Sequence, residues 1–231
     1  MFRDIALFLH SVFHATPLAS GQRDYWDTTK EQEVDHVVSL LSETQDPERI
    51  EIRRILRELE TRTLLDAGCG PGTELTGYKE SAMRIDYTGI DGSQRMISLA
   101  RQRHPSASFI RGSLSELPFN DKSFDVVLLK HILEHQTDYQ PLVKEAVRVS
   151  RKAVIINHFH RLLPFSFHVM LKDRRGFHNN WYSRSKFEKF CFSLPVARCD
   201  HLLSTGTARQ TAEIYVLHRS NETAMKPKTS R

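Results

Sequence analysis

Apolar positions along the chain follow two periods, one typical of helices and one typical of buried strands. Within residues 34–41 and 52–59, apolar side chains recur at intervals of three or four, which places them on one face of a helix. Farther along, short runs rich in aliphatic and aromatic residues are separated by polar stretches. These runs predict strands at residues 63–67, 87–91, 108–111, 124–129, 153–158, 196–203 and 212–218.

Helical patterns lie between several of the predicted strands. The spacing predicts helices at residues 96–103 and 139–149, and a capping box that begins at Ser185 starts another. Strands that alternate with helices are typical of an α/β fold with a mainly parallel sheet. The sequence therefore predicts a three-layer sandwich around a Rossmann-like seven-stranded sheet.

The loop after the first predicted strand contains the most informative chemistry. Residues 66–72 read Asp-Ala-Gly-Cys-Gly-Pro-Gly, and the next strand ends in Asp91. In an α/β fold this arrangement places a nucleoside across the carboxyl ends of adjacent strands. A pyrophosphate loop reads G-x-G-x-x-G, but the third glycine would fall at Thr73, and Glu74 would repel phosphate. The pattern favours a cationic nucleoside without phosphate over a dinucleotide.

Three motifs in order carry a family resemblance. They are D-x-G-C-G-x-G at residues 66–72, G-x-D-x-S at residues 89–93, and L-P-F-x-D-x-S-F-D, which starts at Leu117. Over roughly residues 60–160 the chain resembles the class I S-adenosylmethionine-dependent methyltransferases. The resemblance implies an antiparallel last strand in the sheet, S-adenosyl-L-methionine as cofactor and S-adenosyl-L-homocysteine as product.

The same motifs indicate which residues hold the cofactor. Glycines let the backbone approach a ligand closely, and Asp91 is placed to bind both ribose hydroxyls. Asp66 can accept hydrogen bonds from the loop or from the ammonium group of the ligand. The alternatives are a plain strand-to-helix turn for the glycines, helix capping for Asp91 and core packing for Met96. The expected cofactor site comprises Tyr25, Asp66, Gly68, Gly70, Gly72, Asp91, Gly92, Met96, Ser113, Leu114 and Lys130.

One position in that site departs from the family pattern. Many relatives have an aspartate where this chain has Ser113, and that aspartate accepts from the adenine amino group. The hydroxyl of Ser113 can accept one hydrogen bond but has no charge, so the expected adenine contact is weaker.

His131 is the candidate catalytic residue. It follows Lys130 at the end of the fourth predicted strand, beside the place where the resemblance puts the reactive methyl group. For a hydroxyl acceptor, an imidazole can take the proton, whereas an amine acceptor needs no base if it arrives neutral. The alternative is that His131 only begins the next helix.

The acceptor is expected to contact segments outside the nucleoside loop. The resemblance divides the chain into N-terminal lid helices (1–60), a core (61–218) with a lid insertion at about 159–182, and a polar tail (219–231) expected to be disordered. The insertion mixes aromatic and polar side chains, as ligand sites do, and its apolar part suits a hydrophobic acceptor or a membrane surface. Basic residues of the chain would attract an anionic acceptor. Candidate substrate-binding residues are His158, His160, Trp181 and Tyr182.

Composition narrows the class of partner. The formal net charge is +5, but no run of five basic residues and no RNA-binding motif occurs, so nucleic acid is not an expected partner. No segment resembles a transmembrane helix or a secretory signal. Three cysteines without C-x-x-C spacing favour free thiols in the cytoplasm, and the histidines of the insertion have no metal-site spacing, so no metal is expected.

The predicted function is methyl transfer from S-adenosylmethionine to an oxygen or nitrogen of a small or medium-sized acceptor. A non-catalytic cofactor-binding or regulatory protein with the same fold is the alternative, and Ser113 is the feature that favours it. An RNA methyltransferase is the least favoured reading, because the chain shows no appended RNA-binding module and lacks the Asn/Asp-Pro-Pro-aromatic motif used for base amines.

Overall fold

The computed structural model describes residues 25–40, 43–158, 162–172, 178–205 and 211–220. Seven strands of this described chain form one sheet in the order β3-β2-β1-β4-β5-β9-β8. Six of them point in the same direction, and β9 runs antiparallel to both of its neighbours, β5 and β8. The strands are β1 Thr63–Ala67, β2 Asp86–Asp91, β3 Ser108–Arg111, β4 Phe124–Lys130, β5 Ser150–His158, β8 Val196–Thr205 and β9 Thr211–Arg219.

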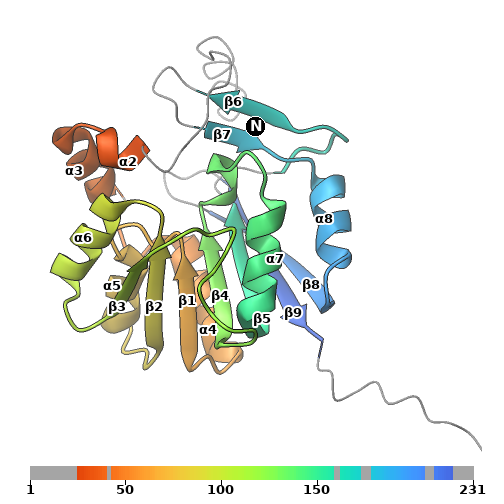
Figure 1. Ribbon diagram of the computed structural model, residues 1–231. Helices are drawn as coiled ribbons and strands as arrows, with labels where there is room; N and C mark the ends of the chain where they lie inside the picture. Colours follow the sequence, from red (N-terminus) through yellow and green to blue (C-terminus); the bar gives the residue numbers. More distant parts are fainter. Residues whose placement is uncertain (1–24, 41–42, 159–161, 173–177, 206–210, 221–231) are drawn as a thin grey trace, which may run out of the picture.

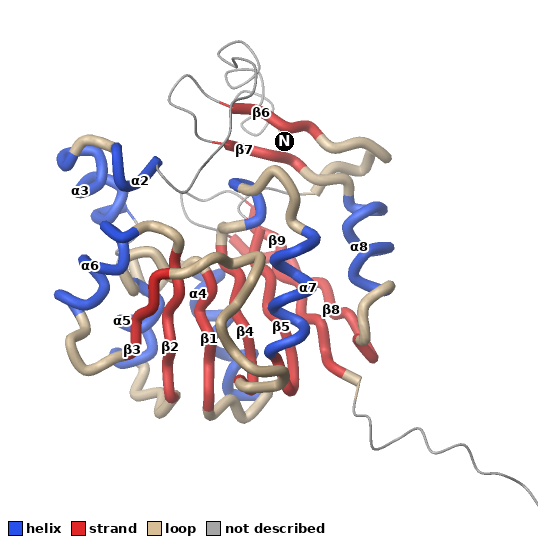
Figure 2. The backbone as a smooth tube through the Cα atoms, viewed as in Figure 1, coloured by secondary structure: helices blue, strands red, loops and turns tan. Residues whose placement is uncertain are grey.

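Helices cover both faces of the sheet (Figures 1 and 2). The helices that pack on the first face are α4 Pro47–Glu58, α5 Thr73–Glu80 and α6 Gln94–Arg103. On the second face lie α7 Gln140–Val149 and α8 Arg184–Phe192. Successive strand residues point to opposite faces, so Leu128 joins the first core and Leu129 the second. The predicted three-layer sandwich and the antiparallel last strand are confirmed.

The central strand β4 shows why these residues form a buried strand. All seven of its side chains are buried, because β1 and β5 flank it and helices cover both faces. Strand order reverses between β1 and β4, since β2 and β3 continue on one side and β5 on the other. The loops that follow β1 and β4 therefore diverge and leave a crevice at the carboxyl ends of the strands.

The segments outside the sandwich differ from the predicted division. Helices α2 Tyr25–Thr28 and α3 Glu31–Leu40 lie outside the layer of α4. In α4, Ile52 and Leu56 are fully buried in the core, so α4 is part of the sandwich rather than of a lid. Residues 1–24 of the expected lid and residues 221–231 of the expected tail lie outside the described residues.

The predicted insertion contains a small sheet that the sequence did not reveal. Strands β6 Val169–Lys172 and β7 His178–Trp181 pair antiparallel. This pair lies beyond the carboxyl ends of the central strands (Figure 1), next to a short 3₁₀ helix, η2 Leu133–His135. No helix in the described part of the chain is both long and apolar enough to span a bilayer.

Candidate functional site

Two connected hollows lie at the carboxyl ends of β1, β2 and β4 in the described part of the chain. Their cavity volumes are about 390 Å³ and 420 Å³. They share Trp26, Gly68, Asp91, Ile132 and His135, so together they form one cleft. The cleft lies at the reversal of strand order, where ligands of open α/β sheets bind.

The glycine loop forms one edge of the first hollow. Gly68 (φ +89°) donates its N–H to the Ile90 carbonyl at 2.7 Å, and a Cβ there would lie 2.2 Å from a side-chain atom of Ile132. Gly70 (φ +50°) differs, because a Cβ there would meet nothing within 4 Å. Gly70 therefore keeps its left-handed backbone beside open space, as a loop that receives a ligand requires.

The third glycine has a structural role. Gly72 (φ +76°) caps the N-terminus of α5, and its carbonyl lies 3.0 Å from His104 Nε2. A Cβ at Gly72 would lie 3.0 Å from the His104 ring and 3.1 Å from Phe109. Gly72 lines neither hollow, so it supports the loop from behind rather than from the cleft surface.

Asp91 lies at the end of β2 and lines both hollows. Its Oδ2 accepts from the Gly70 N–H at 3.0 Å, and its Oδ1 accepts from the Ser93 N–H at 2.9 Å. Burial raises the pKa of Asp91 above its usual value, and these backbone N–H groups oppose the shift. The cap of α6 is Ser93, whose Oγ accepts from the Met96 N–H at 3.1 Å. Since each carboxylate oxygen has a further lone pair, Asp91 can still accept from a diol.

Asp66 lies at the end of β1 with its carboxylate almost fully buried beside the first hollow. The Tyr87 hydroxyl donates to its Oδ2 at 2.7 Å. Burial and the neighbouring Glu74 carboxylate raise the pKa of Asp66 to about 7, although the Tyr87 hydrogen bond favours the ionised form. A cation that entered the hollow would therefore meet a carboxyl group that titrates near neutral pH.

A network of buried charges lies below the loop. Lys130, at the end of β4, donates to Glu48 Oε1 at 2.8 Å and lies 3.9 Å from Glu74. Glu74 also lies 3.3 Å from the Nε of Arg49. Burial raises the pKa of Glu48, but His131 and Lys130 outweigh it and hold that pKa well below its usual range. Lys130 thus lines the first hollow, with its charge already balanced by carboxylates.

His131 lies between two charged partners. Its Nε2 is 3.3 Å from Glu48 Oε2, and its Nδ1 is 3.2 Å from Lys130 Nζ. The backbone at His131 is left-handed (φ +54°), and its N–H donates to the Asn157 carbonyl at 2.9 Å. Helix η2 begins two residues later, at Leu133. Glu48 can only accept, so Nε2 donates to it, and Nδ1 faces the Lys130 ammonium; His131 can therefore accept a proton on Nδ1 only after the contact with Lys130 opens.

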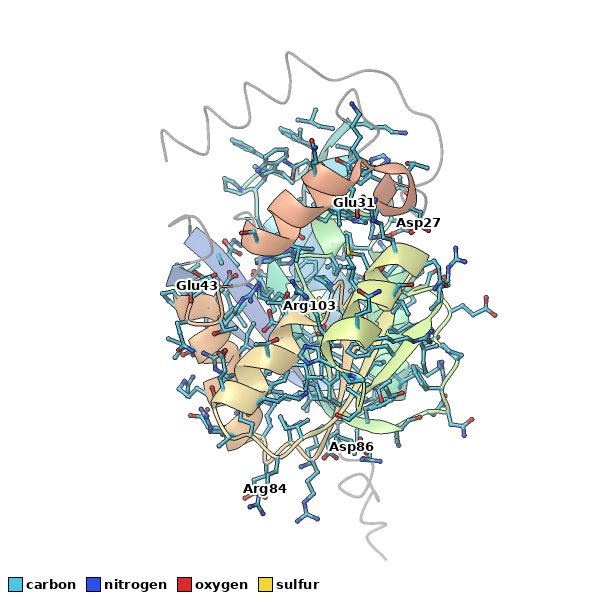
Figure 3. All side chains as sticks on the ribbon, turned by 90° about the vertical axis from the view of Figure 1, so that its left-hand side faces the viewer. Asp27, Glu31, Glu43, Arg84, Asp86 and Arg103 are labelled. Carbon is cyan, nitrogen blue, oxygen red and sulfur yellow. The ribbon has the colours of Figure 1, made fainter. Side chains whose placement is uncertain are left out.

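Helix α2 forms the opposite wall. Tyr25 lines the first hollow and Trp26 lines both, with their rings in an edge-to-face contact at 5.1 Å. Asp27 holds this helix, because its carboxylate accepts from the Ser93 hydroxyl at 2.6 Å and from the Arg95 N–H at 3.0 Å. Figure 3 shows Asp27 above α6, at the end of the molecule opposite Arg84. The aromatic pair is thereby fixed to the same turn as Asp91.

The remaining predicted cofactor residues divide between the two hollows. Met96 lines the first and packs against Val34 and Val38 of α3, whereas Gly92, Ser113 and Leu114 line the second. The Oγ of Ser113 lies 3.0 Å from Ser115 Oγ. Of the predicted cofactor residues, all except Gly72 therefore line the cleft.

The predicted acceptor residues are placed differently. His158 is buried, with its Nδ1 3.4 Å from Glu134 and its ring against Phe187. Trp181 and Tyr182 are buried too, and the Tyr182 hydroxyl donates to the Leu133 carbonyl at 2.8 Å. These three residues line neither hollow, which corrects the prediction, and His160 lies outside the described residues.

Several residues of the cleft were not predicted. Asn179 of β7 lines the first hollow and His178 of β7 lines the second. From the first turn of α4 come Arg49, which lines the first hollow, and Glu48, which is fully buried and accepts from Lys130. The sequence signal for Glu48 and Arg49 is the predicted helix start at Asp46 and Pro47. That signal does not show that this end of the helix lies near the cleft. Within the described residues, no group of three or more His, Cys, Asp or Glu side chains is arranged to hold a metal ion.

Comparison with known proteins finds methyltransferases. Residues 65–156 match the family model described as a methyltransferase domain. The chain is 32% identical over 118 residues to a phthiotriol/phenolphthiotriol dimycocerosates methyltransferase of Mycobacterium tuberculosis, covering 48% of this chain and 44% of that protein. It is 28% identical over 104 residues to a demethylmenaquinone methyltransferase of Thermotoga maritima, covering 45% of each. These matches span less than half the length of the two relatives.

Solved structures extend the likeness to most of the fold. A Burkholderia thailandensis 1,6-didemethyltoxoflavin-N1-methyltransferase, solved with its acceptor and S-adenosylhomocysteine, has a TM-score of 0.67 at 15% identity. The likeness covers 89% of this chain and 93% of that one. The family model identifies residues 65–156 as a methyltransferase domain, and the solved structures share the fold of this chain.

Proposed function

We propose that this protein transfers a methyl group from S-adenosylmethionine to an oxygen or nitrogen of a small or medium-sized, largely apolar acceptor. The observation that carries the proposal is the cleft at the carboxyl ends of β1 and β2, where Asp91 and the open side of Gly70 face the same hollow. Two of the relatives are named for lipid and quinone methylation, which favours an apolar acceptor.

The donor set of the cleft fits a cationic nucleoside. Asp91 would bind the ribose hydroxyls, and the carboxylate of Asp66 would attract the ammonium group. Ser113 and Leu114 would contact the adenine in the second hollow, where Asp91, assigned to the ribose, is the one carboxylate among the described lining residues. The space beside Gly70 admits a ligand against the loop backbone. When bound, the cofactor supplies a methyl group that is already activated by a positively charged sulfur.

The protein then has to orient the acceptor and exclude water. Trp26 and Ile132 give the cleft an apolar lining beside His131. For a hydroxyl acceptor, His131 would take the proton on Nδ1 after its contact with Lys130 opens, and Glu48, beside Nε2, would stabilise the imidazolium. An amine acceptor that enters neutral needs no base.

The first experiment measures transfer of labelled methyl from S-adenosylmethionine to a panel of quinols, phenols, amines and lipid extracts. We expect product with wild-type protein, and His131→Ala should lower turnover while leaving S-adenosylhomocysteine affinity unchanged. Retained turnover in that variant would remove His131 from the mechanism. Absence of transfer to every class of acceptor would contradict the proposed function.

Asp91 tests the ribose assignment. Asp91→Ala should weaken binding of S-adenosylmethionine and S-adenosylhomocysteine by about 2 kcal/mol, roughly 30-fold, because hydrogen bonds to a charged group are lost. Calorimetric titration measures the affinity. Asp86→Ala, at the opposite end of the same strand, is the control and should bind like wild type. Unchanged affinity in Asp91→Ala would refute the assignment.

Asp66 predicts a pH dependence of cofactor binding. Only its ionised form attracts the ammonium group, and its pKa is about 7, so affinity should rise several-fold between about pH 5.5 and 7.5. Asp66→Asn should abolish most of that rise in affinity. The rise that remains in the variant measures the contribution of titration of the ligand itself. An identical pH profile in wild type and variant would contradict the ammonium contact.

A further inference from the structure

Exposed apolar side chains gather beside β6. Among the described residues, three of the six exposed large apolar side chains lie between Phe165 and Met170. Phe165 and Phe167 are 56% and 54% exposed, and Met170 is 43% exposed. The two phenyl rings stack with centroids 5.4 Å apart and planes within 4° of parallel. We call these three side chains the hairpin face.

The hairpin face belongs to a part of the molecule that is tied to the cleft. In β7, Asn180 donates to the Gln136 carbonyl at 2.7 Å, and the His178 carbonyl lies 2.7 Å from His135 Nδ1. Leu163, just before the phenyl pair, donates its N–H to the Tyr182 carbonyl at 2.8 Å. The bonds to Gln136 and His135 join the strand pair to η2, which follows the cleft-lining residues Lys130, His131 and Ile132. The hairpin face therefore has a fixed position relative to the cleft.

The sequence around the same segment is rich in basic residues. Residues 159–186 contain six Lys or Arg and one Asp, a net charge of +5 that equals the net charge of the whole chain. Lys172 ends β6 and Lys186 is exposed in the first turn of α8. Lys186 also acts on His168, whose pKa is lowered first by burial and then by that ammonium. Exposed aromatic rings with nearby cations match the surface of an anionic bilayer.

We propose that the hairpin face docks this protein on the surface of an anionic lipid bilayer. The phenyl rings would enter the boundary between headgroups and acyl chains, and the lysines would remain among the headgroups. A stable protein interface buries about 800 Å² on each partner, far more than three side chains supply, whereas a bilayer needs only a few inserted rings. Docking would bring the cleft, with Asn179 and His178 in its wall, close to acceptors dissolved in the bilayer.

Vesicle co-sedimentation without cofactor or acceptor tests the docking. The probes are vesicles of phosphatidylcholine alone and of phosphatidylcholine with equimolar phosphatidylglycerol. Wild-type protein should bind the anionic vesicles more tightly, and added salt should weaken that binding. Phe165→Ser with Phe167→Ser should weaken binding to the anionic vesicles at least about tenfold, because the two rings that would enter the bilayer are lost. Lys172→Glu with Lys186→Glu should remove the preference for the anionic lipid.

A matched control separates docking from general hydrophobicity. Phe192 is 63% exposed at the far end of α8, so Phe192→Ser should bind vesicles like wild type. Phe165, Phe167, Lys186 and Phe192 are exposed and Lys172 is partly buried, so unchanged melting temperatures are needed to show that the variants fold. Absence of binding to anionic vesicles, or equal loss in the Phe192 variant, would overturn the proposal. So would conversion of a dimer to a monomer by the double phenylalanine variant without any vesicle binding, which would assign the face to a second copy.

The inference goes beyond the proposed function and is tested separately from it. Vesicle binding requires no methyl donor, so its absence would leave the methyl-transfer assay untouched. Conversely, an inactive protein that still bound anionic vesicles through the phenylalanines would support docking and contradict the enzymatic proposal alone.

Discussion

The carboxylate of Asp91 joins the two turns on which the cleft depends. One oxygen accepts from Gly70 in the loop after β1, and the other accepts from Ser93 at the start of α6. Hydrogen bonds to an ionised acceptor are stronger than those between neutral groups, so a single side chain fixes both turns. The hydroxyl of Ser93 in turn donates to Asp27, which holds α2 and its aromatic pair over the cleft. The glycine loop, the proposed ribose site and the wall formed by α2 therefore all depend on Asp91.

Charge balance explains how so many ionised groups can be buried in one place. Glu48, Glu74, Lys130 and Arg49 pair with one another, which offsets the cost of removing them from water. Asp66 and Asp91 are left with hydrogen-bond donors that have no full charge, and burial raises the pKa of both. The cleft thus has carboxylates that a cationic ligand can neutralise, together with an apolar lining suited to an uncharged acceptor.

Sequence patterns predicted the fold because the strands are continuous aliphatic runs, as in β4, and because the glycine loop has few structural uses. They did not predict β6 and β7, because β7 contains His178, Asn179 and Asn180, and such polar residues are typical of a loop. Glu48 was missed because its partner Lys130 lies 82 residues away along the chain. His158 and Tyr182 were assigned to the acceptor site because sequence cannot distinguish an aromatic-polar mixture in a core from one in a pocket.

Calorimetric titration with S-adenosylmethionine, S-adenosylhomocysteine and NAD tests the central claim most directly, since the claim rests on a glycine loop that admits a cationic nucleoside and disfavours pyrophosphate. The account predicts micromolar binding of the first two ligands and no binding of NAD. Binding of NAD, or of none of the three, would contradict it.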